Sequence, residues 1–283
     1  MTAPHGTRRL CICADDYGMS AGINAAVLNL VERGRISATG CMVLRSAWKV
    51  GAQRLSTLSP LLLDAGLHLD LSHLPGRDGA DRSLGRLIAA CYLRTADRAW
   101  LREQVRMQLA MFEEAMGRAP SFVDGHRHVH QLPMVRDILV RELSDRYAGQ
   151  PPWLRSTAPG RAVRWPQKQD LIFALGGRAL RRQARQHGIP TNGRLLGVYA
   201  FDDTVPYRTR LENWAEGCAD RDVLMCHPSL SRLPSDPIAE ARCREYRALN
   251  AFDATAHTAG GLPVTVMPLS QIPACRAASE DSR

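Results

Sequence analysis

The stretch ICADDYGMSAGINAAVLNLVERG, residues 12–34, joins a short apolar run to a helical pattern. Residues 9–14 predict a buried strand. Four apolar residues then recur at the spacing of one helix face: Ile23, Val27, Leu30 and Val31. Ser20 is placed to cap the start of this helix and Gly34 to end it. A strand followed at once by a helix is the repeating unit of an α/β fold.

The same alternation continues along the chain. Strands are expected at 40–44, 66–72, 121–125, 195–200, 222–226 and 263–267, and helices at 98–116, 208–218, 237–250 and from Pro133 onward. This order predicts a parallel sheet covered by helices. About seven or eight such units predict a single-domain, distorted, TIM-like (β/α) barrel. We expect one domain over residues 1–270 and a flexible tail over 271–283.

Composition narrows the class of protein. Apolar residues make up 45% of 283, which is enough for a large core. No run of about 18 apolar residues predicts a membrane span, and the N-terminal residues lack the apolar region of a signal peptide, so we expect a cytoplasmic protein. The eight cysteines form no CxxC pair, which favours buried free thiols over disulfides or structural zinc.

The chain carries a net charge of +9, which fits either an anionic partner or solvated arginine-rich faces. Segment 177–188 is the densest basic patch, with four arginines at helical spacing: Arg178, Arg181, Arg182 and Arg185. Such a stripe is compatible with peripheral contact with an anionic membrane. It lacks interleaved aromatic residues that would stack on bases, so nucleic acid is not the expected partner.

Two adjacent carboxylates, Asp15 and Asp16, end the first strand. Like charges side by side repel, so the pair has no evident structural advantage. A divalent cation would offset the repulsion. One aspartate would then bind the cation, and the other would stay free to accept a proton from water.

Histidines follow or end other predicted strands. His68 lies in the third strand, His227 follows the strand 222–226, and the segment DGHRHVHQLP, residues 124–133, holds three more. Parallel α/β barrels build active sites at the carboxyl ends of their strands, so these side chains should converge at one mouth.

The histidine cluster favours a metal or proton-transfer role over a packing role. If its backbone is extended, the three histidines share one face with Asp124: His126, His128 and His130. Asp16, His68 and one histidine of this cluster would form an open cation site. The remaining histidines would orient the ligands or touch substrate, and Arg155, at the end of another short run, is placed to approach the same mouth.

Four ordered motifs then match a known family. ADDYGMSAGINAAVLNLVERGRISATGCMV, AGLHLDL, FVDGHRHVHQLP and LMCHPS resemble the YdjC-like carbohydrate deacetylases, which include chitooligosaccharide deacetylases and hopanoid-biosynthesis-associated deacetylases. The resemblance covers residues 8–145 well and 195–230 loosely. This chain has Tyr17 where the family usually has Phe, and Ser229 where it favours Gly. No family pattern covers 150–195.

The resemblance implies a distorted barrel that uses a divalent metal ion to remove acetyl groups from N-acetylated sugars. It implies that Asp15 is the catalytic base, that Asp16, His68 and His126 are the metal ligands, and that His227 is the general acid. The ion would be magnesium or zinc, with nickel or cobalt as alternatives, because a site of one carboxylate and two imidazoles accepts all of them. Family members commonly form homodimers.

The sequence therefore predicts a metal-dependent N-deacetylase acting on an N-acetylated amino sugar, as an oligosaccharide or a glycolipid. Two alternatives stay open at this point. The charge and the Asp/His set would also suit a metal-dependent phosphoesterase or nuclease, and the charge alone would suit a non-enzymatic nucleic-acid-binding protein. The sequence names neither the sugar nor the native metal.

Overall fold

A central parallel sheet organises the computed structural model, which describes residues 6–72, 83–160 and 168–273. Within these residues the strands are β1 (Arg8–Tyr17), β2 (Ala38–Cys41), β3 (Asp64–Leu69), β4 (Phe122–Gly125), β5 (Trp153–Leu154), β6 (Leu195–Leu196), β7 (Asp222–Cys226), β8 (Thr258–Ala259) and β9 (Leu262–Val266). Their main order is β5-β4-β3-β2-β1-β7-β6, with every neighbour parallel. β9 also pairs with β1 in parallel, and β8 is its antiparallel neighbour.

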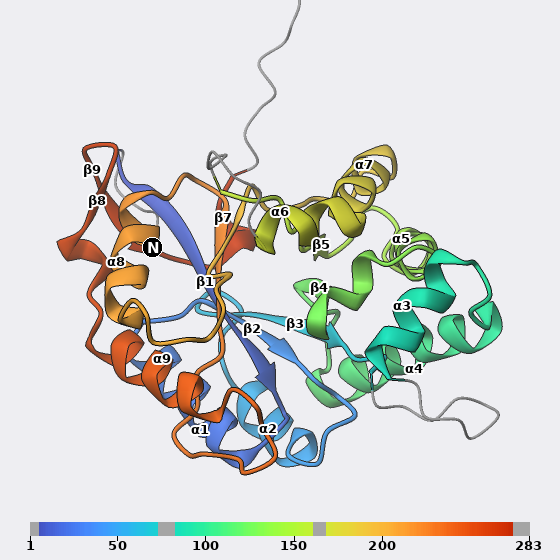
Figure 1. Ribbon diagram of the computed structural model, residues 1–283, viewed down its shortest axis with the longest axis horizontal. Helices are drawn as coiled ribbons and strands as arrows, with labels where there is room; N and C mark the ends of the chain where they lie inside the picture. The colour runs from blue at the N-terminus through green and yellow to red at the C-terminus, as the bar shows by residue number, and fades with distance from the viewer. Residues whose placement is uncertain (1–5, 73–82, 161–167, 274–283) are drawn as a thin grey trace, which may run out of the picture.

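Helices surround this sheet (Figure 1). They are α1 (Ala21–Glu32), α2 (Trp48–Leu55), α3 (Leu84–Tyr92), α4 (Arg98–Met116), α5 (Val135–Arg146), α6 (Lys168–Ile172), α7 (Arg178–Gln186), α8 (Tyr207–Glu216) and α9 (Ala239–Ala251). Short helical turns lie at His126–Gln131, Phe173–Gly177, Ala254–Ala256 and Leu269–Gln271.

The two end strands of the sheet, β5 and β6, are brought together by the segments beside them. The backbone N–H of Leu154 donates to Pro190 O (2.8 Å), and that of Leu195 donates to Ala158 O (2.7 Å). Leu154 also forms an isolated parallel bridge with Thr191. The sheet therefore curls into a distorted barrel, and the predicted fold class is confirmed.

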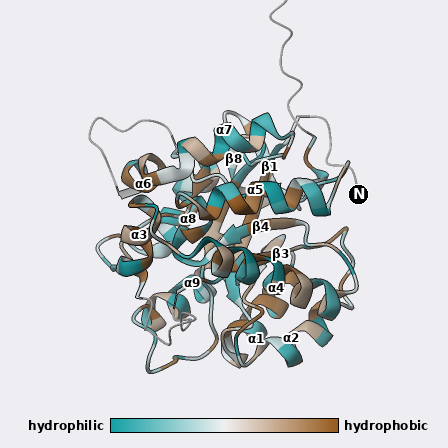
Figure 2. Cartoon of the chain, turned by 90° about the vertical axis from the view of Figure 1, so that its right-hand side faces the viewer, coloured by the Kyte–Doolittle hydropathy of each residue, from teal (hydrophilic) through white to brown (hydrophobic). Residues whose placement is uncertain are grey.

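The helices predicted from apolar spacing occur where they were expected. α4 covers residues 98–116 as expected, and the apolar side chains that share one of its faces are buried: Leu101, Val105, Leu109, Phe112 and Met116. In α1 the Ser20 hydroxyl accepts from the backbone N–H of Ile23 (3.2 Å), as an N-cap does. Figure 2 shows apolar and polar residues alternating along α5. These helices bury one face each against the sheet.

The strand expected at 195–200 is shorter than predicted. β6 ends at Leu196 because Gly197 takes a left-handed φ of +87° and passes directly over the β7 backbone. A Cβ at this position would lie 2.0 Å from Met225 O. Only glycine fits there, and the chain leaves the sheet at that point.

The described residues also bear on the predictions for the cysteines, for membrane spans and for the C-terminal tail. Their seven cysteines are free thiols, six of them buried, while Cys243 is half-buried. No helix among these residues is long and apolar enough to cross a membrane. Ile272 is 2% exposed, so the chain is still packed at the start of the expected tail. The rest of that tail, from residue 274, lies outside the described residues.

Candidate active site

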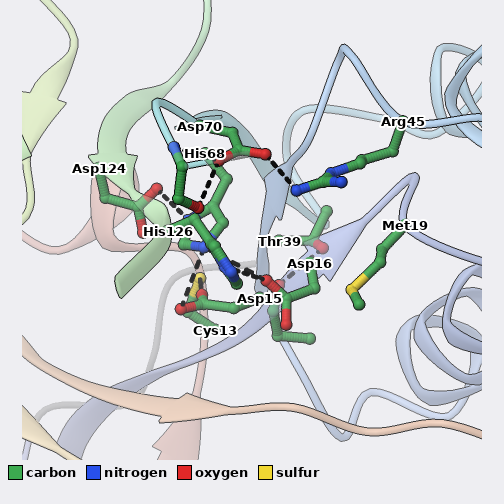
Figure 3. A network of polar contacts seen from close by, with 12 residues as sticks. Cys13, Asp15, Asp16, Met19, Thr39, Arg45, His68, Asp70, Asp124 and His126 are labelled. Atoms are coloured by element: carbon green, nitrogen blue, oxygen red, sulfur yellow. Dashed lines mark hydrogen bonds and ion pairs between the residues drawn. The ribbon is translucent and has the colours of Figure 1, made fainter. Parts of the chain in front are cut away.

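The carboxyl end of β1 turns two adjacent carboxylates toward the same interior. Asp16 adopts a left-handed φ of +70°, and the pairing of β1 with β2 slips between Ala14 and Tyr17. Successive side chains of a regular strand point to opposite faces, so this irregularity is what brings Asp15 and Asp16 together. Both are almost fully buried, at 2% and 1% exposure, and both lie among the clustered side chains of Figure 3.

Asp15 is held by a buried guanidinium. Arg155, which follows β5 and is 1% exposed, donates from Nη1 to Asp15 Oδ2 (2.6 Å) and from Nη2 to Asp15 Oδ1 (2.7 Å). Burial would raise the pKa of Asp15, but Arg155, His68 and His227 together outweigh burial and lower the pKa to about 2. Asp15 is therefore ionised at neutral pH, and its orientation is fixed by a two-pronged contact.

Arg155 also reaches a second carboxylate, which orients a histidine. Its Nη1 lies 2.7 Å from Asp124 Oδ2, and Asp124 Oδ1 accepts from His68 Nδ1 (2.7 Å). Contacts with Asp124, Asp15 and Asp16 outweigh burial and raise the pKa of His68 well above its usual value, so the ring is protonated on both nitrogens unless a cation replaces the proton on Nε2. That atom lies 3.4 Å from Asp16 Oδ1.

Asp16, His68 and His126 form a candidate cation site. One ligand atom of each lies within 4.8 Å of the others, and His126 Nδ1 is 3.0 Å from Asp16 Oδ1. The donor set fits a catalytic cation because it has one carboxylate, two imidazoles and an adjoining cavity. The contact from Asp124 to the far nitrogen of His68 is typical of metal-ligating histidines.

A second group of three, Asp15, His68 and Asp124, also lies within ligand distance. Both of its aspartates are engaged by Arg155. A cation there would have to displace or repel a buried guanidinium, so we assign the candidate site to the first group.

The backbone of the three clustered histidines is not extended, so the predicted common face does not form. Residues His126–Gln131 form a 3-10 turn in which Arg127 and His128 have left-handed φ values of +52° and +60°. The turn sends the side chains to different places. His126 reaches Asp16, His128 lines the cavity, and His130 Nε2 donates to Arg155 O (2.9 Å).

The latter two histidines are neutral at neutral pH. Burial lowers the pKa of His128 to about 3 and that of His130 to about 4. His130 is fully buried, and its contact with the backbone of Arg155 holds the residue that orients Asp15. It lies outside the candidate ligand set.

His227 stands directly after β7 and lines the same cavity. Burial lowers its pKa to about 4, against the opposing effect of Asp16 and Asp15, so its ring is neutral at rest. The ring packs edge-on to that of Phe201, with centroids 5.3 Å apart. Its backbone N–H donates to the carboxylate of Glu245.

Sequence reasoning missed the buried residues of α9 and of the loop before it. Arg242 is 3% exposed, and its Nη2 donates to Asp16 Oδ2 (2.6 Å), while its Nε donates to Asp236. Glu245 is fully buried beside His227. Nothing in the helical pattern 237–250 separates these two charges from the exposed ones around them.

These groups surround a cavity of about 660 Å³. Its polar lining includes Asp15, Asp16, His68, His126, His128 and His227. Much of its apolar and aromatic lining comes from Ile172, Val198, Tyr199, Phe201 and Met225. A few convergent polar groups in a mostly apolar cavity are typical of a small-molecule site.

The family model for YdjC-like proteins matches residues 9–256. The chain belongs to this family. The sequence-based prediction of the family is confirmed, and the match extends through the segment 150–195, which lies outside the four motifs.

Two named relatives are similar to this YdjC-like protein. A carbohydrate deacetylase of Homo sapiens is 28% identical over 253 residues, covering 80% of this chain and 76% of the relative. A chitooligosaccharide deacetylase of Serratia marcescens is 32% identical over 139 residues, covering 44% and 52%. The predicted enzyme class is the one that these relatives carry in their names.

A solved structure shares the fold. The protein EF3048 of Enterococcus faecalis V583 superposes with a TM-score of 0.62 at 17% sequence identity, covering 87% of this chain and 91% of that one. The likeness supports the barrel architecture.

Proposed function

We propose that this YdjC-like protein hydrolyses the N-acetyl group of an N-acetylated amino sugar, releasing acetate and a free amine. One observation carries the proposal. Asp16, His68 and His126 each offer a ligand atom within 4.8 Å of the others, which could hold a cation, and a second, separately held carboxylate, Asp15, lies beside them. The deacetylase names of the relatives agree with this chemistry.

Asp16, His68 and His126 would hold one divalent cation. When bound, such an ion polarises an amide carbonyl and stabilises negative charge on its oxygen. Two imidazole nitrogens and one carboxylate suit zinc, nickel or cobalt, whereas magnesium usually prefers oxygen ligands. We therefore rank zinc before magnesium among the metals expected from the sequence.

Asp15 serves as the base in this proposal. It accepts a proton from the water whose oxygen bonds to the carbonyl carbon. Its two contacts with Arg155 aim the carboxylate and keep it ionised. Asp124 and His130 support this arrangement from the side of the sheet, since they contact Arg155 itself.

His227 serves as the acid. The carbon–nitrogen bond breaks as the departing nitrogen receives a proton, and the acetyl group leaves as acetate. His227 is neutral at rest, so it must gain its proton after substrate binds. The nearby charges of Asp16 and Asp15 favour that gain because they raise the pKa of His227.

The sugar class, the assembly and the location remain proposals. The apolar lining of the cavity would accept an oligosaccharide or the attached group of a glycolipid. The arginines at 178, 181, 182 and 185 are all exposed on α7, and co-sedimentation with anionic vesicles would show whether they contact a membrane. We retain the cytoplasmic homodimer as a prediction, which light scattering and cell fractionation can check.

Acetate release tests the proposal. The purified protein should release acetate from at least one member of a panel of N-acetylated oligosaccharides and glycolipids, and a chelator should abolish the release. Added zinc, nickel, cobalt or magnesium should restore it to different extents. Phosphate release from model esters without any acetate release would overturn the proposal in favour of a phosphoesterase.

A further inference from the structure

Helix α9 buries two charged side chains on one face, one turn apart. Arg242 and Glu245 are 3% and 0% exposed, whereas Glu240 of the same helix is 54% exposed and pairs with Arg232. Burying a charge is costly unless it is paired. Arg242 meets carboxylates of Asp16 and Asp236. Glu245 has no such cationic partner in any ion pair of the described residues.

Glu245 instead accepts two neutral hydrogen bonds. One comes from the backbone N–H of His227 and the other from the Tyr199 hydroxyl, at 2.7 Å. Burial raises the pKa of Glu245 to about 7. An apolar residue at this position would avoid the free-energy cost of burying a carboxylate. Packing alone therefore does not explain why Glu245 and its two hydrogen bonds are present.

Glu245 joins two segments that both reach the catalytic cavity. Tyr199 comes from the segment after β6, and His227 comes directly after β7; both line the cavity. The backbone N–H of Ser229 donates to Arg242 O (3.2 Å), so α9 holds the turn after β7 at a second point. Pro228, between them, has no N–H to offer.

We propose that Glu245 is a positioning residue for His227: it fixes the backbone that carries the proton donor and ties it to the Tyr199 hydroxyl. The inference rests on the proposed deacetylase function, in which His227 protonates the leaving amine. It adds a residue that touches neither substrate nor cation and acts only through the placement of the His227 ring.

A double-mutant cycle separates this role from general support of the fold. Glu245→Ala removes both contacts and should lower kcat on the order of 10²-fold, because a displacement of about 1 Å in a catalytic group has effects of this size. KM should change much less. In the His227→Ala background the same substitution should have almost no further effect, because the group it positions is gone.

Glu245→Gln tests whether the contacts or the charge matter. The glutamine carbonyl still accepts from His227 N–H, and its amide donates to the Tyr199 oxygen. Turnover should therefore stay within about threefold of wild type, since both hydrogen bonds survive. Glu245→Asp keeps the charge but shortens the reach, so it should resemble the alanine variant. If Glu245→Ala does not fold, Glu245→Asp can take its place in the double-mutant cycle.

Glu240→Ala is the matched control, because it removes an exposed glutamate of the same helix. It should leave kcat unchanged. Cation content should be the same in all variants, because Glu245 contacts no residue of the cation site.

The outcomes distinguish the inference from the function on which it rests. If the wild type releases no acetate from any sugar, the proposed function fails. If the wild type is active but Glu245→Ala lowers kcat equally with and without His227, the positioning role is overturned. An inactive Glu245→Gln that is folded and loaded with cation would also overturn it, because the charge would then be required.

Discussion

Asp15 and Asp16 are neighbours in the chain, yet two different regions of the molecule hold them. Asp15 belongs to a network carried by the sheet, in which Arg155 and Asp124 lie at the ends of β5 and β4. Asp16 is held from outside the sheet by Arg242 of α9. Both oxygens of Asp15 are engaged by one guanidinium, whereas Oδ1 of Asp16 faces His68 and His126.

This difference explains how an adjacent pair of like charges can divide two tasks. Each aspartate has its own arginine, so the repulsion within the pair is offset twice. Both oxygens of Asp15 face a guanidinium, whose charge disfavours a metal cation there, while each oxygen keeps a lone pair that can accept a proton. The helix-side contact occupies only one oxygen of Asp16, which leaves the other for the cation site.

The largest expected effect comes from breaking the sheet-side network. Arg155→Met leaves the buried Asp15 and Asp124 without their cation, which should lower the free energy of unfolding by about 3–5 kcal/mol. Urea denaturation measures this change. Arg208→Met, which removes an exposed i,i+4 ion pair with Glu212, should cost less than about 0.5 kcal/mol. Equal losses in the two variants would show that Arg155 is not the centre of a buried network.

The cation site beside Asp16 should respond in cation binding instead. His126→Ala removes a proposed ligand and should abolish occupancy, whereas His130→Ala, which loses only the contact with Arg155 O, should weaken affinity by about 10- to 100-fold. Metal analysis after dialysis, followed by a competition titration, measures both. Full occupancy in His126→Ala would remove that residue from the ligand set.

Much of this architecture can be predicted from sequence. The ends of β1, β3, β4 and β7 are recognisable from apolar runs followed by polar residues, and the rule for parallel strands brings them to one mouth. α1 and α4 are predicted well because their apolar spacing extends over several turns. β5 has only two residues, which is too short for any periodic signal, and β6 keeps only the first two residues of the strand expected at 195–200.

The remainder depends on tertiary contacts. The left-handed residues Arg127 and His128 redirect the histidine cluster, and no local pattern marks them. Arg242 and Glu245 look like surface charges of a polar helix until the packing of α9 is known. Their burial follows from partners more than 200 and 40 residues away, respectively.

Asp15→Asn sharpens the division of labour within the pair. The asparagine keeps the shape but cannot take a proton, so turnover should fall by on the order of 10²-fold or more while cation occupancy persists. Asp16→Asn should instead lose cation occupancy, and its turnover should fall because the cation is missing. If Asp15→Asn empties the cation site and Asp16→Asn does not, the two assignments must be exchanged.

The smallest expected effect concerns Glu245 and pH. Its pKa is raised to about 7 from a usual value of 4.5, so between these values the folded protein keeps a proton that the unfolded chain has released. The free energy of unfolding should therefore fall as pH rises through this window, by no more than about 1.4 kcal/mol per pH unit. Glu245→Gln lacks the titration, and its stability relative to wild type should increase from pH 5 to pH 7 and then level off. Thermal or urea unfolding of both proteins across this pH range measures the difference in their free energies of unfolding. The other titrating groups contribute equally to both proteins, so they cancel in this difference. If the difference in unfolding free energy between the two proteins does not change with pH, the pKa of Glu245 is not raised by folding. Glu245 would then be ionised in the folded protein, as Asp15 is.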